Sequence, residues 1–243
     1  MRDFTNLGWP EAPFGADQRP FGRRSDMLAA FAFEWANRRA DDTLPVGAAV
    51  IYLCVRKRGS AEDIRAGTVS IGFRATVVDC MSEAPALLAL VDRALTRARR
   101  HAAIVAGHRL DDDLTRMTAL STTPLRGAAG VLAAWADRTK RERGLALMVD
   151  TYVEASATGA DLDATGQPRP TPMQDSAERR VAVACTVLER CLAIGLTAAV
   201  YTGRYRWDGT FPVGETIDCV AWDVLTPTER AWDLAEQLPR AGP

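Results

Sequence analysis

The sequence predicts an α/β protein in which a mixed five-stranded sheet is flanked by helices. Two observations support this fold class. Three strand-like runs follow one another between residues 46 and 79, and helix and strand patterns alternate from residue 82 to about residue 200. Consecutive strands usually pair antiparallel, whereas strands separated by a helix add to a sheet in parallel, so this order predicts a sheet of both kinds.

Three segments are expected along the 243 residues. Residues 1–44 are expected to form an N-terminal arm and a helix, residues 45–202 the α/β domain, and residues 203–243 an appendage packed on that domain. The first 24 residues of the arm are rich in proline, glycine and aromatic residues. The aromatic side chains favour packing on the body of the protein or on a partner, because they are poorly suited to a disordered tail.

Local patterns place the first elements. A helix is predicted over residues 25–39, because Leu28, Phe31 and Trp35 fall on one helical stripe. The nearly all-apolar run at residues 46–55 predicts a buried central strand. The other four strands are predicted at residues 68–74, 75–79, 102–106 and 145–149.

Helices are expected between and after these strands. Ser82 begins a predicted helix that ends near His101, with Pro85 in its first turn. Its inward face is predicted to consist of Leu87, Leu88, Val91, Leu95 and Ala98. Further helices are predicted from about residue 111, over residues 130–143, and from residue 175 or 176 to about residue 200.

The appendage is predicted to contain a hairpin and a helix. Residues 204–211 include Asp208-Gly209, a dipeptide that favours a tight turn between two strands. Residues 226–229 match a capping box with Pro227 at the first helical position, which predicts a last helix to about residue 238.

A motif follows the fourth predicted strand. Gly107-His108 ends an apolar run, and Asp113 stands five residues after the histidine. This pattern resembles the second motif of the DEDD 3'-5' exonuclease superfamily, G-H-N-x-x-F-D. Gly107 and His108 match, Arg109 stands for the Asn, Asp112 stands for the Phe, and Asp113 falls on the position of a metal ligand.

The resemblance implies a ribonuclease H-like sheet over about residues 45–200, and the predicted order of elements agrees with it. It also implies carboxylates that hold two Mg²⁺ or Mn²⁺ ions, which activate a water and stabilise the attacking and leaving oxygens of a phosphodiester. Asp150-Thr151 resembles an Asp-Thr pair at the end of the family's fifth strand. The role of that pair is structural, so we expect Asp150 to orient a turn.

Other parts of the family's site differ in this sequence. The family's first motif is D-x-E on the first strand, and residues 46–55, taken as that strand, contain no carboxylate. The third motif, His-x-Ala-x-x-Asp, has Asp175 at the His position and Arg180 at the position of the ligand Asp. A positive charge there disfavours a metal ion. The resemblance therefore implies a degenerate member with a degraded two-metal site.

The candidate site residues follow from this alignment of motifs. The candidate catalytic residues are Asp113, Asp175 and Glu178, with Asp113 as the metal ligand. The candidate contacts to nucleic acid are His108, Arg109 and Arg180. A guanidinium in a cleft that keeps its shape still binds phosphate, even where the metal ions are lost.

Three hypotheses remain open. The first is an exonuclease-like protein, inactive or weakly active, that binds DNA, RNA or a partner protein. The second is an active metal-dependent 3'-5' exonuclease, in which Mg²⁺ or Mn²⁺ is held by Asp113 with Asp175 or Glu178, and with Asp79 and Glu83. The third is an unrelated α/β enzyme or a structural component of a homo-oligomer. An aromatic N-terminal arm that crosses to a neighbouring subunit would support the oligomer.

Composition limits these hypotheses. The formal net charge is −1 and the sequence pI is about 6.2. No global excess of positive charge is available to hold nucleic acid, so any such site must be a local patch. The N-terminus lacks the apolar core of a signal peptide, and no run reaches the ~18 apolar residues of a membrane span. A cytoplasmic protein without a membrane partner is expected.

Overall fold

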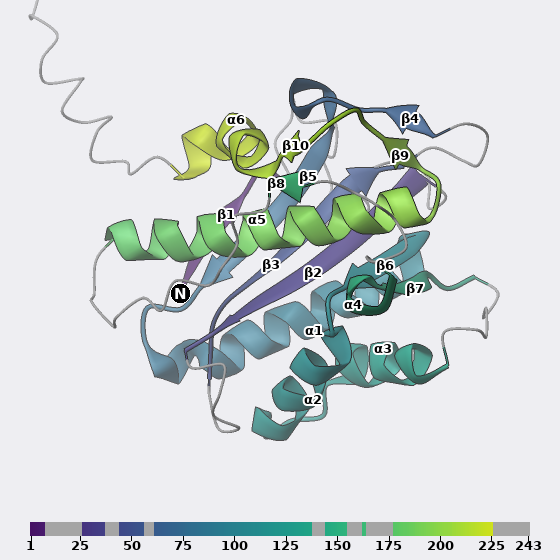
Figure 1. The fold of residues 1–243 in the computed structure, drawn as a ribbon. Helices are drawn as coiled ribbons and strands as arrows, with labels where there is room; N and C mark the ends of the chain where they lie inside the picture. The colour runs from purple at the N-terminus through teal and green to yellow at the C-terminus, as the bar shows by residue number, and fades with distance from the viewer. Residues whose placement is uncertain are drawn as a thin grey trace, which may run out of the picture.

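The computed structural model describes seven ranges of the chain: residues 1–7, 26–36, 44–55, 61–137, 144–154, 162–163 and 177–225. Most of the predicted N-terminal arm, and the whole of the helix predicted from Pro227 to about residue 238, lie outside the described residues. In the described part, a mixed six-stranded sheet is covered by helices on both faces (Figure 1). The α/β class predicted from the sequence is therefore confirmed.

The strands of this sheet lie in the order β1-β5-β3-β2-β6-β7. Their bounds in that order are Arg2–Thr5, Ile71–Val77, Pro45–Cys54, Met27–Trp35, Ile104–Gly107 and Leu147–Asp150. Neighbours from β1 to β2 pair antiparallel, and β2, β6 and β7 pair parallel. The two strands predicted at residues 68–74 and 75–79 are one strand, β5, and two strands that were not predicted, β1 and β2, bring the number to six.

The helix predicted over residues 25–39 is wrong, because this segment contains β2 at the centre of the sheet. On one face of β2, Leu28 and Ala30 pack in the core beneath α5. On the other face, Ala29 and Phe31 pack in the core beneath α1. A strand buried on both faces is apolar throughout, so its sequence fits a helical stripe as well as an alternation. Burial on both faces overrode the helix propensity of the alanines.

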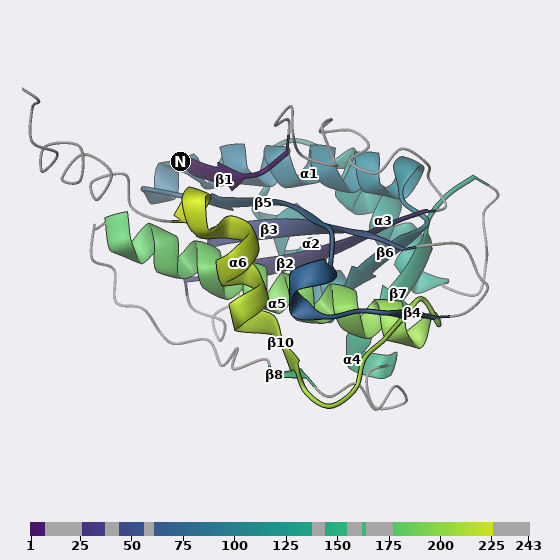
Figure 2. The ribbon, with the colours of Figure 1, turned by 90° about the horizontal axis from the view of Figure 1, so that it is seen from above.

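Helices cover the sheet in two layers (Figure 2). One face is covered by α1 (Ala84–His101), α2 (Leu110–Leu120) and α3 (Arg126–Ala136). The other face is covered by α5 (Ala177–Tyr201) and α6 (Val213–Leu225). The shorter helices whose full lengths lie within the described ranges include α4 (Thr151–Glu154) and the 3-10 helices Ala66–Thr68 and Met81–Glu83.

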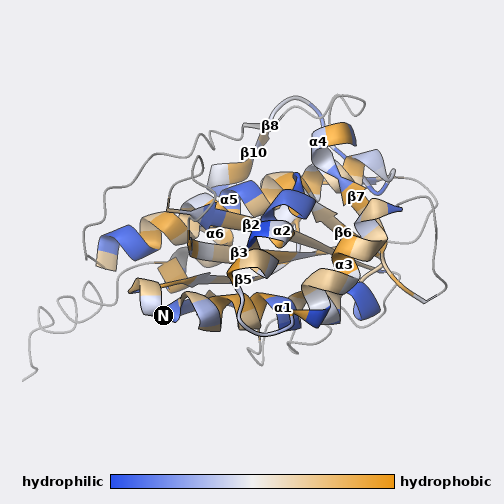
Figure 3. Ribbon diagram, turned by 90° about the horizontal axis from the view of Figure 1, so that it is seen from below, coloured by the Kyte–Doolittle hydropathy of each residue, from blue (hydrophilic) through white to orange (hydrophobic). Residues whose placement is uncertain are grey.

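The predicted helix over residues 82–101 is confirmed as α1, with a proline in its first turn. All five side chains predicted to face inward are buried: Leu87, Leu88, Val91, Leu95 and Ala98. Hydrophobic and hydrophilic residues both recur along the whole of α1, as expected of a helix with one buried face (Figure 3). The predicted starts of α2 and α5 are also confirmed, within two residues.

The 25-residue helix α5 crosses the face of the sheet over β3 and β2. It has the length and mean hydropathy of a membrane span, and 61% of its most apolar window is buried within the fold. The buried thiol of Cys191 on this helix donates to the Ala30 carbonyl oxygen at 3.0 Å. Contacts of this kind place α5 as the core helix on this side of the sheet.

The hairpin predicted over residues 204–211 is wrong. β9 (Tyr205–Arg206) pairs with β4 (Glu62–Asp63), and β10 (Phe211–Pro212) pairs with β8 (Leu162–Asp163), both in parallel. The predicted turn exists, since Gly209 has a φ of +68°. The turn instead joins two strands that pair with distant segments, and α6, which was not predicted, follows directly.

Candidate nucleic-acid interface

The carboxyl ends of β6 and β7 lie side by side, with Gly107 opposite Asp150. Beyond this point, the segments that follow β6 and β7 run in different directions. β6 continues into α2 on the α1 face, whereas β7 continues into α4, which contacts α5 (Figure 1). In open α/β sheets, ligands bind at the carboxyl end where the connections diverge to opposite faces. The motif identified in the sequence stands at this position.

The turn between β6 and α2 requires a glycine at its start. A Cβ atom on Gly107 would lie 2.4 Å from the Cβ atom of Leu110. Two residues later, Arg109 has a φ of +53°, in the left-handed region that L-residues with side chains seldom adopt. It is the only positive-φ residue other than glycine in the part of the chain that the structure describes. Such a conformation costs about 1–2 kcal/mol, so the surrounding contacts must hold it.

Asp150 and Thr151 hold this turn from the neighbouring strand. The Oδ1 atom of Asp150, which is only 6% exposed, accepts from the backbone N–H of Arg109 at 3.2 Å and of Tyr152 at 3.0 Å. The hydroxyl of Thr151 donates to the Gly107 carbonyl oxygen at 3.1 Å and lies 3.3 Å from Nδ1 of His108. The prediction that Asp150 orients a turn is confirmed.

An exposed aromatic side chain on α4 stands beside this turn. Tyr152 is 59% exposed. The His108 ring meets it edge-on, with ring centroids 5.5 Å apart, and the Arg109 guanidinium lies 5.1 Å from the centroid of the Tyr152 ring. Arg109 also pairs with Asp112 at 2.6 Å. The cluster of His108, Arg109 and Tyr152 offers an aromatic surface beside a cation, which suits a nucleobase and its phosphate.

The sequence pointed to His108 and Arg109 but not to Tyr152. The available signal was a tyrosine directly after the Asp-Thr pair, since that pair marks the end of a strand at the carboxyl edge of the sheet. Whether the tyrosine faces solvent depends on α4, a four-residue helix. Nothing in the local pattern indicated that helix.

Asp113 contacts a residue of β2, which lies outside this cluster. Its Oδ1 atom accepts a hydrogen bond of 2.8 Å from the indole N–H of Trp35 at the end of β2. The Arg116 guanidinium in turn lies 5.8 Å from the Trp35 ring centroid. The predicted metal ligand thus joins α2 to β2 on the α1 face of the sheet.

The start of α5 carries the other predicted residues. Arg180 pairs with Asp79 at 2.9 Å, and the Met1 amine contacts both Asp79 and Glu83. Hydrogen bonding from the Met1 amine, and then the Arg180 charge, hold the pKa of Asp79 below its usual value. Glu178 is exposed in the first turn of α5. Asp175 lies outside the described residues.

Of the predicted catalytic residues, the structure describes Asp113 and Glu178, and these two belong to helices on opposite faces of the sheet. Asp113 contacts β2 on the α1 face, whereas Glu178 and Arg180 belong to α5 on the opposite face. His108 and Arg109 form a third group with Tyr152 at the ends of β6 and β7. Only this third group combines an exposed aromatic ring with a cation.

The described side chains do not fit a pair of divalent ions. On β2, the positions that face α5 carry Leu28, Ala30 and Ala32, and the next, Glu34, pairs with Arg190 at 2.8 Å. Within the ranges that the structure describes, no three His, Cys, Asp or Glu side chains form a group that could hold a metal ion. Two-ion hydrolysis needs several carboxylate oxygens directed at one point.

Comparison of the chain with protein-family models, with curated proteins and with solved structures gave no match. The function must therefore be argued from the geometry of this site.

Proposed function

We propose that the protein is a ribonuclease H-like domain that binds single-stranded nucleic acid without two-metal hydrolysis. The arrangement of strands supports the fold part of this proposal. Three consecutive strands, β2, β3 and β5, pair antiparallel, and β6 and β7 then add in parallel on the other side of β2. Such a sheet agrees with the resemblance between Gly107-His108 to Asp113 and the second exonuclease motif. β1 is an additional edge strand.

The exposed Tyr152 ring, flanked by His108 and Arg109, is the observation that carries the binding function. A base stacks on an aromatic ring with a gain of about 1–3 kcal/mol, and every base has a face that suits such a ring. The Arg109 guanidinium beside the ring suits the adjacent phosphate. The cluster also lies at the diverging carboxyl ends of β6 and β7, the position at which open α/β sheets bind ligands.

Fluorescence anisotropy with a labelled single-stranded oligonucleotide tests this function. Oligo-dT and oligo-U are titrated at low ionic strength with the wild-type chain and with Tyr152→Ala. Loss of a stacking contact of about 1–3 kcal/mol weakens binding roughly 5- to 150-fold. Tyr201→Ala is the matched control, because Tyr201 is also exposed (46%) but lies at the end of α5.

Two outcomes would contradict the proposal. The wild-type chain would show no saturable binding to either oligonucleotide, or Tyr201→Ala would weaken binding as much as Tyr152→Ala. A salt titration gives a second check, because binding that depends on few phosphate contacts has a shallow dependence on salt.

A nuclease assay separates the proposal from the hypothesis of an active exonuclease. Oligonucleotides labelled at the 5' end are incubated with Mg²⁺, Mn²⁺ or a chelator, beside an Asp113→Asn control. Asparagine keeps an oxygen for the Trp35 hydrogen bond and removes the charge that a metal ion needs. We expect no shortening. Metal-dependent shortening from the 3' end that disappears in the control would establish the active alternative instead.

A further inference from the structure

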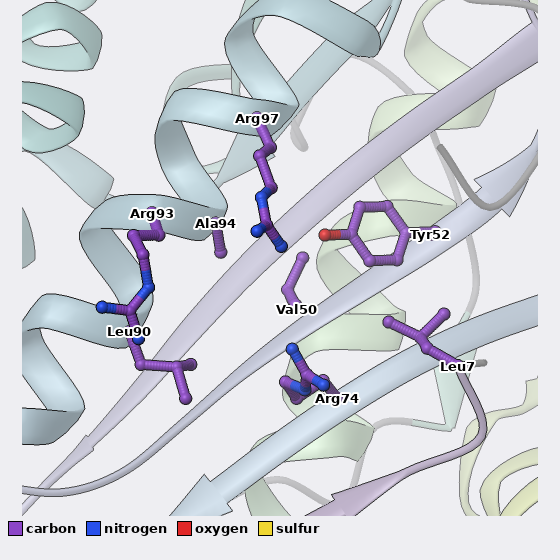
Figure 4. A pocket seen from close by; sticks show the side chains of 8 residues that line it. All are labelled: Leu7, Val50, Tyr52, Arg74, Leu90, Arg93, Ala94 and Arg97. Carbon is purple, nitrogen blue, oxygen red and sulfur yellow. The ribbon is translucent and has the colours of Figure 1, made fainter. Parts of the chain in front are cut away.

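A cavity of about 220 Å³ lies between α1 and the β3–β5 side of the sheet, on the face opposite α5 (Figure 4). Its apolar walls are formed by Leu7 after β1, Val50 on β3, and Leu90 and Ala94 on α1. In the order of the sheet, β2 separates these strands from β6 and β7. The cavity is therefore distinct from the interface around Tyr152.

Three arginines line this cavity, and none of the described side chains that line it is acidic. Arg93 and Arg97 stand one helical turn apart on α1, and Arg74 comes from β5. The guanidinium groups of Arg97 and Arg74 and the hydroxyl of Tyr52 are directed toward the same space, while Arg93 lies further out beside Leu90 (Figure 4). Two guanidinium groups are thus directed into a cavity whose other walls are largely apolar.

One carboxylate borders this group. Oδ2 of Asp3 lies 3.1 Å from Nε of Arg74, and the Thr76 hydroxyl donates to Oδ1 of Asp3 at 2.8 Å. Asp3 thereby fixes the direction of the Arg74 side chain and offsets one positive charge. Three cationic side chains thus line the cavity, and Asp3 contacts one of them. The charges of several guanidinium groups stabilise an anion that lies among them.

We propose that this cavity binds a small phosphate monoester. The phosphate lies between Arg74 and Arg97, because each guanidinium group can donate two parallel hydrogen bonds to phosphate oxygens. The carbon atoms lie against Leu7, Val50 and Leu90. The volume of 220 Å³ is below the roughly 300–1,000 Å³ of pockets for drug-sized ligands, so the ester carries few carbon atoms. Inorganic phosphate presents the same chemistry without the carbon atoms.

Isothermal titration calorimetry of the full chain tests this proposal. The titrants are glycerol 3-phosphate, inorganic phosphate and neutral glycerol, with chloride added to keep the ionic strength constant. We expect saturable binding of both phosphates, tighter for the ester because its carbon atoms contact the apolar walls, and none of glycerol. Equal affinities for the two phosphates would identify inorganic phosphate as the ligand that the site recognises.

Variants on α1 locate the binding. Arg97→Gln removes a cation from the cavity and is expected to weaken phosphate binding about tenfold or more. Arg100→Gln is the matched control: Arg100 is exposed in the same helix but does not line the cavity. Both positions are on the helix surface, so circular dichroism should show an unchanged fold. The proposal is overturned if no heat of saturable binding appears up to about 10 mM phosphate. Equal weakening by both variants would overturn it as well.

Discussion

The carboxyl edge of the sheet has two halves that use charge differently. In the half formed by β2 and β5, charged groups pair with one another: Glu34 with Arg190, and Asp79 with Arg180 and the Met1 amine. In the half formed by β6 and β7, Asp150 accepts from backbone N–H groups. Arg109 stands beside the exposed Tyr152, and its pair with Asp112 is solvated, with both side chains about half exposed.

This difference separates charges that stabilise the fold from charges that are available to a ligand. A cation paired with a half-buried carboxylate stabilises the folded chain, because removing either partner leaves an uncompensated charge. A cation held over an exposed ring by a backbone turn contributes little to stability, since the pair is solvated. Variants on the two halves should therefore differ in which property they change.

The largest expected effect is on the β2 half. Arg190 and Glu34 are 17% and 13% exposed in their side chains, and Arg190 also donates to the Phe33 carbonyl oxygen at 2.7 Å. Arg190→Met leaves the Glu34 carboxylate without this cation, and we expect the free energy of unfolding in urea to fall by about 3–5 kcal/mol. The double variant Glu34→Leu with Arg190→Met should recover most of it. A loss below about 1 kcal/mol would show that the pair does not hold this half together.

The next effect is on the β6 half. Gly107→Ala places a Cβ atom 2.4 Å from Leu110, and we expect a loss of about 1–3 kcal/mol in unfolding free energy together with weaker oligonucleotide binding. Gly67→Ala is the matched control, because nothing lies within 4 Å of the added atom there. Unchanged binding in a folded Gly107→Ala chain would mean that the turn does not position the interface.

Arg109→Gly should change stability and binding in opposite directions. Glycine adopts a φ of +53° without strain, so unfolding free energy is expected to rise by about 1 kcal/mol. The pair that Arg109 makes with Asp112 is solvated, with side chains 56% and 48% exposed, and its loss subtracts little. Anisotropy titrations should show weaker oligonucleotide binding, because the cation beside Tyr152 is gone. An Arg109→Gly chain that is less stable than wild type but binds the oligonucleotide equally well would contradict both expectations.

The smallest expected effect is on the pH dependence of folding stability, through Asp79 just after β5. The pKa of Asp79 is lowered from 3.8 by hydrogen bonding from the Met1 amine and by the Arg180 charge. A lowered folded-state pKa means that the contribution to stability is fully present above pH 3.8 and is lost as the pH falls through the folded value. Asp79→Asn should cost about 1 kcal/mol or less at pH 7, because Asp79 is half exposed.

Thermal unfolding across pH measures this contribution. The melting temperatures of wild type and Asp79→Asn should differ at pH 7 and converge below pH 3.8. Arg180→Gln should reproduce part of the difference. Curves that stay parallel down to pH 2 would show that the lowered pKa has another origin.

Much of the fold could be predicted because its signals are local. The proline and apolar spacing of α1, the acidic first turn of α2 and the apolar run of β3 lie within single elements. β2 was predicted as a helix because burial on both faces removes the alternation that distinguishes a strand. The hairpin predicted in the appendage was wrong because its strands pair with distant segments. β9 pairs with β4 and β10 with β8, so the turn between β9 and β10 does not join two strands of one hairpin.

The sequence by itself determined which residues stand at the end of β6 and that Asp150 orients a turn, since both follow from short motifs. Only the tertiary structure decided that Asp113 bonds to Trp35, that Arg180 pairs with Asp79, and that Tyr152 is exposed. Motifs and periodicity are properties of neighbouring residues. The partner of a charged side chain depends instead on which faces and edges the assembled sheet brings together, which no local pattern contains.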